Sequence, residues 1–215
     1  MTLKLSALLV LGAIFAPAQT VQLFNGKDMD GWKAIGRSEG AANVAGFAVH
    51  DGLLETTQGK GVLWFTKRKI GNATIRVVYK MSNERGNSGV FIRIPVEPAN
   101  EDDAINKGIE VQIDNRDNDW HCTGVLYSMT KAMARPYKPA GEWNTLEITL
   151  DGLRTVVKVN GVLVTDYDGV SPVPEKHQSY EPDRGPRPAE GYIALQHHDD
   201  SCVFSFKEVS VTPLK

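Results

Sequence analysis

Polar and apolar side chains alternate along residues 108–114, a segment of the length of one strand. Successive side chains of a strand point to opposite faces, so the polar residues of this segment share one face. They are Glu110, Gln112 and Asp114. Carboxyl groups transfer protons and amides hold hydroxyl groups, so this face suits acid–base chemistry on a polar organic substrate.

Residues 88–94 alternate in the same way and place Arg93 opposite a face of Val and Ile side chains. If this segment pairs with residues 108–114, Arg93 lies near Glu110 or Gln112. A cation would then stand beside a proton-transfer group. The same alternation also fits an ordinary solvent-exposed sheet face that carries an Arg–carboxylate ion pair.

A third segment, residues 192–198, places Tyr192, Gln196 and His198 on one face. Histidine changes its charge near neutral pH and can act as a base. His198 therefore joins Glu110 as a candidate for proton transfer, and Gln196 joins Gln112 as a candidate for holding hydroxyl groups.

Three aromatic residues could stack on a sugar ring, and one of them, Trp120, directly follows the polar run 114–119. The candidates are Trp64, Trp120 and Tyr127, whereas Trp32 and Trp143 lie beside apolar strand residues and are predicted to pack in the core. The run 114–119 contains oxygen ligands for calcium but lacks the spacing of an EF-hand loop, which favours a solvated turn.

The two cysteines, Cys122 and Cys202, each follow closely after histidine. A disulfide, two unreactive thiols and a mixed His/Cys metal site all fit these positions. The spacing matches none of the short paired zinc patterns.

Short alternating segments separated by turn dipeptides dominate the chain. Hairpins are predicted at Asp51-Gly52, Asp151-Gly152 and Asn160-Gly161, because these dipeptides tolerate the positive φ of tight turns. A change of parity in the last segment predicts a β-bulge near residues 207–208. Helical periodicity is confined to a turn around residues 100–107. The fold class is therefore all-β, a sandwich or a barrel.

The composition excludes several classes of function. The 215 residues contain 24 Lys plus Arg and 26 Asp plus Glu, a net charge of −2 that argues against a nucleic-acid partner. Lys4, the apolar run 5–16 and the small residues at 16–18 are typical of a signal peptide spanning 1–18, with an N-terminal membrane anchor as the alternative. No comparable apolar run follows, so no membrane span is predicted after residue 18. The sequence shows no internal repeat and no domain boundary, which predicts one domain over 19–215.

Several segments together resemble the 3-keto-disaccharide hydrolase family, which includes 3-keto-glucoside lyases and glycal hydratases. The resemblance spans nearly the whole chain after the signal peptide, in the order of the family. The segments read LFNGKD at 23–28, GW at 31–32, GNSGVFIR at 86–93, IEVQI at 109–113, TGVLY at 123–127, KPAGEWN at 138–144, VNG at 159–161 and GYIALQH at 191–197.

The resemblance implies a concanavalin A-like jelly-roll β-sandwich of two antiparallel sheets, secreted or periplasmic in bacteria. It also implies a carbohydrate substrate, a glycoside whose C3 hydroxyl has been oxidised to a ketone. The chain departs from the family pattern at residues 198–200, where His-Asp-Asp replaces His-Gly.

A C3 ketone acidifies the hydrogen on C2, so a base can form an enolate and the bond from C1 to oxygen can break by elimination. The resemblance implies Glu110 or His198 as the base and Arg93 as the group that stabilises the enolate. A divalent metal held by Asp114 or a nearby histidine is the alternative electrophile. The residues expected to contact the sugar are Gln112, Asp114, Trp120, His121, Tyr127, Gln196 and His197.

Two other functions fit the same residues. Two-carboxylate glycoside hydrolysis would use Glu110 and Asp114, but four strand steps separate their Cα atoms by roughly 13 Å. The carboxyl groups of such enzymes lie at most about 9.5 Å apart. A carbohydrate-binding domain without catalysis would use the aromatic and amide groups alone.

Overall fold

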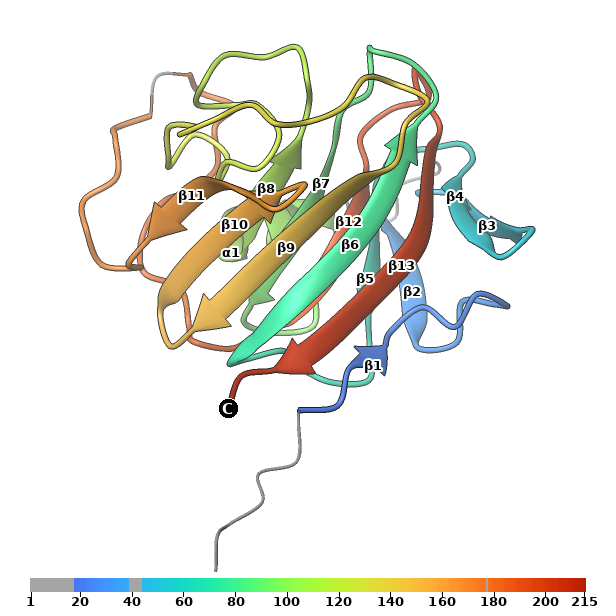
Figure 1. Cartoon of the computed structure of the whole chain (residues 1–215), viewed down its shortest axis with the longest axis horizontal. Helices are drawn as coiled ribbons and strands as arrows, with labels where there is room; N and C mark the ends of the chain where they lie inside the picture. The colour runs from blue at the N-terminus through green and yellow to red at the C-terminus, as the bar shows by residue number, and fades with distance from the viewer. Residues whose placement is uncertain (1–17, 39–43, 177) are drawn as a thin grey trace, which may run out of the picture.

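The computed structural model describes residues 18–38, 44–176 and 178–215 (Figure 1). The predicted signal peptide, apart from its last residue, lies outside these ranges. No helix in the described part of the chain is long and apolar enough to cross a membrane.

Two antiparallel sheets face one another (Figure 1). The eight-stranded sheet runs in the order β11-β10-β9-β6-β13-β4-β3, with β1 paired to β13. Its strands are β1 (Val21–Gln22), β3 (Phe47–His50), β4 (Leu53–Thr56), β6 (Ala73–Met81), β9 (Asn144–Asp151), β10 (Arg154–Val159), β11 (Val162–Tyr167) and β13 (Phe204–Pro213). The prediction of an all-β sandwich is confirmed.

The five-stranded sheet runs in the order β2-β5-β12-β7-β8. Its strands are β2 (Trp32–Gly36), β5 (Gly61–Phe65), β7 (Ser88–Ile94), β8 (Ile109–Ile113) and β12 (Tyr192–His197). The three segments singled out for their chemistry, β7, β8 and β12, are therefore neighbours, because β7 pairs with both of the others.

All three predicted hairpins are present, joining β3 to β4, β9 to β10 and β10 to β11. Asn160 and Gly161 have φ of 50° and 82°, as a type I′ turn requires. The predicted bulge in β13 is also present, since the pairing with β6 shifts register between Phe206 and Glu208.

The main core lies between the sheets and takes alternate residues of each strand. On β6 these are the five apolar residues of one parity, from Ala73 to Met81, all of them buried. Both cysteines belong to this core as free thiols, so there is no Cys122–Cys202 disulfide. Within the described part of the chain, no group of three His, Cys, Asp or Glu side chains could hold a metal ion at them.

The other face of the five-stranded sheet, which we call the outer face, carries a second apolar cluster. The helix α1 (Glu101–Lys107) covers part of it, with Ala104 against side chains of β5, β7 and β12. The Asn100 side chain caps this helix by accepting from the backbone N–H of Asp103 (2.9 Å). The predicted helical turn is thus confirmed.

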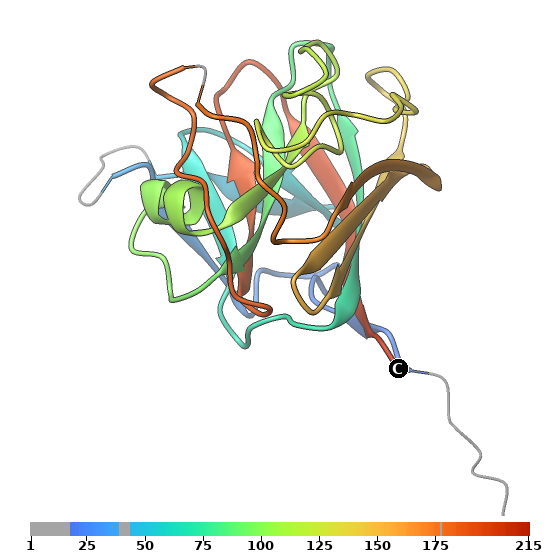
Figure 2. The ribbon, with the colours of Figure 1, turned by 90° about the vertical axis from the view of Figure 1, so that its left-hand side faces the viewer.

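The long loop between β11 and β12 crosses the same outer face (Figure 2). Arg187 fastens it to the C-terminal end of α1 by donating to the carbonyls of Asn106 (2.8 Å) and Gly108 (2.9 Å). Cations are favourable at a helix C-terminus, where carbonyls lack intrahelical partners. The loop is therefore held beside α1, and both border the same part of the sheet.

Candidate active site

A pocket of about 250 Å³ opens on the outer face between α1 and the long loop. Residues of β8, β12, α1 and the long loop line this pocket, together with residues that directly precede β7 or follow β2, β8 and β12. Its lining consists of Arg37, Asn87, Glu101, Ile105, Glu110, Gln112, Tyr127, Tyr180, Pro182, Gln196 and His198. Five residues predicted from sequence, Glu110, Gln112, Tyr127, Gln196 and His198, thus meet in one place.

Glu110 lies on β8 with its side chain folded over Gly89 of β7 and partly buried there. This burial, together with the nearby negative charge of Glu101, raises the pKa of Glu110 to about 8. With its nitrogen turned toward Glu110, the Gln112 amide donates to Glu110 Oε1 (3.1 Å) and to the Ser88 carbonyl (3.2 Å). At neutral pH, Glu110 is therefore mainly a protonated carboxyl group with one oxygen held in position.

Gly89 on β7 makes room for this carboxyl group. A Cβ added at Gly89 would stand 2.2 Å from Glu110 Oε1 and 2.7 Å from its Cγ. Heavy atoms cannot approach so closely, so any larger residue at position 89 would displace the Glu110 side chain. The glycine is thus part of what positions the carboxyl group.

Glu101 and Gln196 form a second polar pair in the pocket. Gln196 Nε2 donates to Glu101 Oε1 (3.1 Å), while Gln196 Oε1 is buried and has no hydrogen-bond partner among the residues that the structure describes. Burial raises the pKa of Glu101. A buried acceptor without a partner costs free energy, so this carbonyl is set to accept a hydrogen bond from a hydroxyl group of a ligand.

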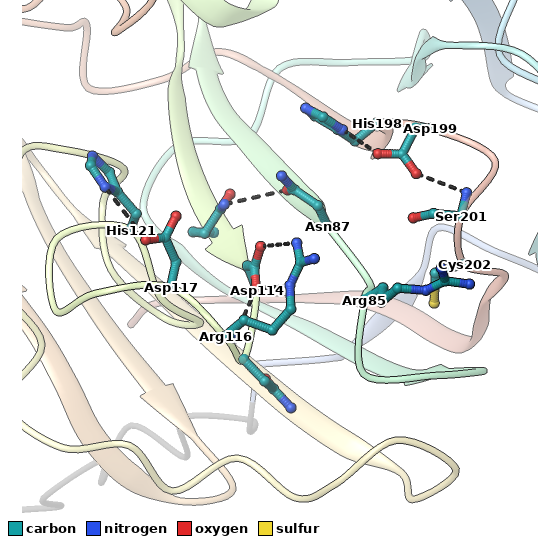
Figure 3. A network of polar contacts seen from close by, with 12 residues as sticks. Arg85, Asn87, Asp114, Arg116, Asp117, His121, His198, Asp199, Ser201 and Cys202 are labelled. Atoms are coloured by element: carbon teal, nitrogen blue, oxygen red, sulfur yellow. Dashed lines mark hydrogen bonds and ion pairs between the residues drawn. The ribbon is translucent and has the colours of Figure 1, made fainter. Parts of the chain in front are cut away.

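His198 stands at the rim of the pocket next to Asp199 (Figure 3). Its Nδ1 lies 2.8 Å from Asp199 Oδ2. Burial alone would raise the pKa of Asp199, but hydrogen bonds from Ser201 and His198 outweigh it and lower the pKa to about 2. An ionised Asp199 requires a proton on Nδ1, which leaves the lone pair of His198 on Nε2.

Sequence reasoning missed several residues of the pocket. Glu101 falls in the predicted helical turn around residues 100–107, which the sequence did not connect with the site, and Arg37, which follows β2, was not singled out. Arg37 brings a positive charge into the pocket lining. Neither residue lies on a strand that carries an alternating polar row, so only the three-dimensional arrangement reveals them.

The position predicted for Arg93 is wrong. Its backbone has φ of +57°, and the pairing of β7 with β12 shifts register at this point, so the alternation breaks. The side chain turns away from Glu110 into the gap between the sheets and is 1% exposed. It donates to the carbonyls of Pro188 (2.9 Å) and Arg154 (3.0 Å) and to Thr155 Oγ1 (3.3 Å).

Arg93 therefore joins the long loop to β10, which makes its role structural. We expect Arg93→Met to lower the free energy of unfolding by about 2–4 kcal/mol, because the buried Thr155 hydroxyl and two partly buried carbonyls lose their donor. For a chain of this size that lowers Tm by roughly 5–15 °C. Thermal unfolding followed by circular dichroism measures the change. Arg85→Met, at an exposed position, is the control; equal Tm values for the two variants would contradict this role.

His197 and Asp114 also lie outside the pocket. His197 is on β12 one residue after Gln196, so its ring points into the interior, 6.2 Å from the Phe47 ring, and burial lowers its pKa. Asp114 accepts from the Arg116 side chain at 3.0 and 2.7 Å (Figure 3). The expected contacts of His197 and Asp114 with substrate are not supported.

The expected divalent metal at Asp114 has no matching set of ligands. Both carboxylate oxygens of Asp114 are taken by Arg116. Across residues 18–38, 44–176 and 178–215, no three His, Cys, Asp or Glu side chains form a group that could hold a metal ion. We therefore derive no chemical step through a metal at this position.

Trp120 and His121 line a second pocket beside the first. The His121 ring packs on the Tyr127 ring with centroids 4.6 Å apart, and His121 Nε2 lies 3.3 Å from Glu181 Oε1. Trp64, a candidate for stacking, is instead buried against Tyr192 (5.1 Å between ring centroids).

The prediction for Trp32 is confirmed, since it is buried. Trp143, predicted to lie in the core, is only half-buried. It lies between the ammonium groups of Lys80 (4.9 Å) and Lys207 (4.5 Å). Lys80 lies on the face of β6 that points away from the core. Trp143 packs on that face, beside Lys80, and so stays outside the core although apolar residues neighbour it in the sequence.

Solved structures share this fold. A protein from Parabacteroides distasonis, provisionally described as a glycosyl hydrolase, has a TM-score of 0.71 and 22% identity, over 91% of this chain and 100% of that chain. The carbohydrate binding module CBM66 from Bacillus subtilis has a TM-score of 0.55 and 15% identity, over 84% and 94%. The endo-β-1,3(4)-glucanase SCLam of family GH16 has a TM-score of 0.53 and 11% identity, over 94% and 92%.

These similarities confirm the concanavalin A-like sandwich, a fold that carries both sugar binding and sugar cleavage. No curated protein matches the sequence. A family model described as the 3-keto-alpha-glucoside-1,2-lyase-like domain matches residues 19–212. Because this match covers nearly all of the chain, the protein belongs to the 3-keto-alpha-glucoside-1,2-lyase-like domain family.

Proposed function

We propose that the protein cleaves the bond between C1 and the glycosidic oxygen of 3-keto-glycosides by elimination. The observation that carries this proposal is the pair of proton-transfer groups in one pocket. Glu110 holds a proton at neutral pH, whereas His198, fixed by Asp199, offers a lone pair on Nε2. A carboxyl group that carries a proton and an imidazole whose Nδ1 faces a carboxylate can serve as acid and base in one pocket.

His198 is the base in this scheme. Its Nε2 removes the proton from C2, and the electron pair of that C–H bond forms the C2=C3 double bond of an enolate. The C3 oxygen becomes negative, and Arg37 supplies the positive charge in the pocket that stabilises it. Arg37 thus takes the part that the sequence had suggested for Arg93.

Glu110 is the acid. When the enolate collapses, the C3 ketone re-forms, a C1=C2 double bond appears and the bond from C1 to oxygen breaks. Glu110 gives its proton to the departing oxygen, so the products are a conjugated enone and a free alcohol. Water that later adds to the enone would complete a net hydrolysis. Gln196 and Gln112 hold hydroxyl groups of the ring through their amides.

Incubation of the purified protein with 3-keto-trehalose and 3-keto-glucosides tests the proposal. We expect ultraviolet absorbance of the enone to rise together with released sugar, and a parallel assay with EDTA tests for a divalent metal. If no keto-sugar reacts while unmodified glycans bind, the protein is a carbohydrate-binding domain, as some proteins of the same fold are.

Asp199→Asn tests the base. Because the Ser201 backbone N–H donates to Asp199 Oδ1 (2.8 Å), an Asn here keeps its oxygen toward Ser201 and turns its NH2 toward His198 Nδ1. Nδ1 must then accept, so the proton of the neutral ring moves to Nε2 and the lone pair needed there is lost. We expect kcat to fall roughly 10- to 100-fold, with little change in KM. Steady-state kinetics on a 3-keto-glucoside measures this change.

The neighbouring Asp200 offers the matched control. It carries the same charge, but it faces the buried His197 (3.6 Å) rather than the pocket. Asp200→Asn should keep kcat within about twofold of the unmodified protein. A loss of equal size in both variants would show that charge near the rim, and not the state of His198, sets the rate.

We also propose that the protein is secreted or periplasmic. The support is the apolar run 5–16, which follows Lys4 and precedes small residues. Mass spectrometry of the protein from the exported fraction, with cleavage near residue 18, is the corresponding test.

A further inference from the structure

Glu101 is a buried carboxyl group of the candidate active site that has no step in the proposed reaction. It stands at the beginning of α1, is 4% exposed and lines the same pocket as Glu110. The helix lies between residues 86–93 and 109–113, two of the segments that resemble the family, and belongs to neither of them. A role for Glu101 therefore has to follow from its surroundings in this chain.

Glu101 and Glu110 share a pocket of only about 250 Å³. Two negative charges in one poorly hydrated pocket repel each other, so one carboxyl group ionises and the other keeps its proton to a higher pH. Each of the two groups accepts one amide hydrogen bond, Glu101 from Gln196 (3.1 Å) and Glu110 from Gln112 (3.1 Å). These hydrogen bonds alone do not decide which of the two ionises first.

The charges that face the two carboxyl groups do decide it. Burial raises the pKa of Glu101, and the hydrogen bond from Gln196 opposes this rise. The positive charges of Arg37 and His198 oppose it as well. For Glu110, in contrast, burial and the charge of Glu101 both raise the pKa. Glu101 is thus the member of the pair that ionises first. The other titratable side chains that line the pocket are Arg37 after β2, Tyr127 after β8, Tyr180 on the long loop and His198 after β12.

We propose that Glu101 is a positioning residue for the acid, a carboxylate whose negative charge keeps the proton on Glu110 in mildly alkaline solution. The inference rests on the proposed function and adds to it the pH range over which the site works. The departing oxygen receives its proton from Glu110, so turnover continues only as long as Glu110 holds that proton. The helix α1 thereby extends turnover toward alkaline pH, although Glu101 transfers no proton itself.

Glu101→Gln removes the charge but keeps the shape and an oxygen that can accept from Gln196. The pKa of Glu110 then falls, because only burial still raises it. We expect the alkaline limb of kcat/KM for a 3-keto-glucoside to move about one pH unit toward acid. Such a shift lowers kcat/KM about fivefold at pH 8 and about tenfold at pH 9, but by less than about twofold at pH 6. Steady-state kinetics across this range measures it.

Two further variants separate the charge of Glu101 from its packing. Glu101→Asp keeps the charge on a shorter side chain, so its alkaline limb should stay at the pH of the unmodified protein whatever its kcat. Asp102→Asn removes a charge at the next position of α1, which is exposed and does not line the pocket, and should leave the limb in place. A limb that moves equally in Glu101→Gln and Asp102→Asn, or in neither, would overturn the assigned role.

Titration of Glu110 by carbon-13 NMR tests the same coupling without turnover. The carboxyl signal of Glu110 is identified as the one missing from Glu110→Gln. We expect its midpoint near pH 8 in the unmodified protein and in Glu101→Asp. In Glu101→Gln we expect a midpoint about one pH unit lower. A thermal melt at pH 6 establishes that each variant is folded.

The NMR titration also distinguishes this inference from the proposed function. Equal midpoints for Glu110 in the unmodified protein and in Glu101→Gln would overturn the role of Glu101 even if keto-sugars react. A lower midpoint in Glu101→Gln, without turnover of any keto-sugar, would overturn the lyase proposal while supporting the control of the Glu110 proton by Glu101.

Discussion

Glu110→Gln abolishes turnover of 3-keto-glycosides, with kcat reduced about 10³-fold or more, because the pocket loses its proton donor. The amide has the shape of the carboxyl group, so KM for the same substrate changes little. The pH profile carries the same information. Since Glu110 must be protonated to act as the acid, kcat/KM of the unmodified protein falls above pH 8, near the raised pKa of Glu110.

The same variant changes stability in a pH-dependent way. The pKa of Glu110 rises from an ordinary 4.5 to about 8 on folding, so folding favours the protonated form. The resulting stabilisation is complete below pH 4.5 and is lost as pH rises toward 8. Glutamine stays neutral throughout, so Glu110→Gln should gain Tm relative to the unmodified protein between pH 5 and pH 9.

A shift of one pKa unit corresponds to about 1.4 kcal/mol of folding free energy. Because Glu110 is partly exposed, the free energy that the unmodified protein loses when Glu110 ionises is smaller than the shift alone implies. We expect the gain in Tm to reach roughly 5–10 °C at pH 9. Differential scanning calorimetry at several pH values measures it. A variant that keeps more than a tenth of the activity, or whose Tm difference is the same at every pH, would contradict the assigned state of Glu110.

Gly89→Ala reduces kcat roughly 100-fold although position 89 bears no reactive group. The added methyl group would stand 2.2 Å from Glu110 Oε1, so the carboxyl group must move. A displacement of about 1 Å is enough to cost a factor of 10² in rate. Kinetics on a 3-keto-glucoside, together with a thermal melt to confirm folding, measures the effect.

The Gly89 prediction has two controls. Gly71→Ala adds the same methyl group where the nearest atom is the flexible Glu190 side chain at 3.3 Å, outside the pocket, and should keep full activity. In the Glu110→Gln background, Gly89→Ala should add little further loss, because both changes remove the same function. Additive losses in the double variant would mean that Gly89 acts through another residue.

Much of the fold followed from local patterns in the sequence. The three hairpins, the helical turn of α1 and the bulge of β13 each depend on periodicity or on a turn dipeptide within a few residues. The order of strands did not follow from these patterns, because pairing between distant segments depends on packing that no short window of sequence contains.

Local patterns placed the site residues correctly only where the alternation of a strand is unbroken. Glu110, Gln196 and His198 were placed together because uninterrupted alternation fixed the faces of β8 and β12. Arg93 was misplaced because a register shift in β7 reverses the parity at that residue. His197 lies on the opposite face from Gln196, as alternation requires, and its assignment to the site came from the family resemblance rather than from parity.

The position of β13 has a consequence for the order of events during synthesis. This strand lies between β6 and β4 in the middle of the eight-stranded sheet, although it is made after every other strand of the described chain. A nascent chain that has not yet reached Phe204 lacks the strand that joins the two halves of that sheet. The sandwich therefore forms only after translation has passed residue 213, and contacts between segments so distant in sequence form slowly.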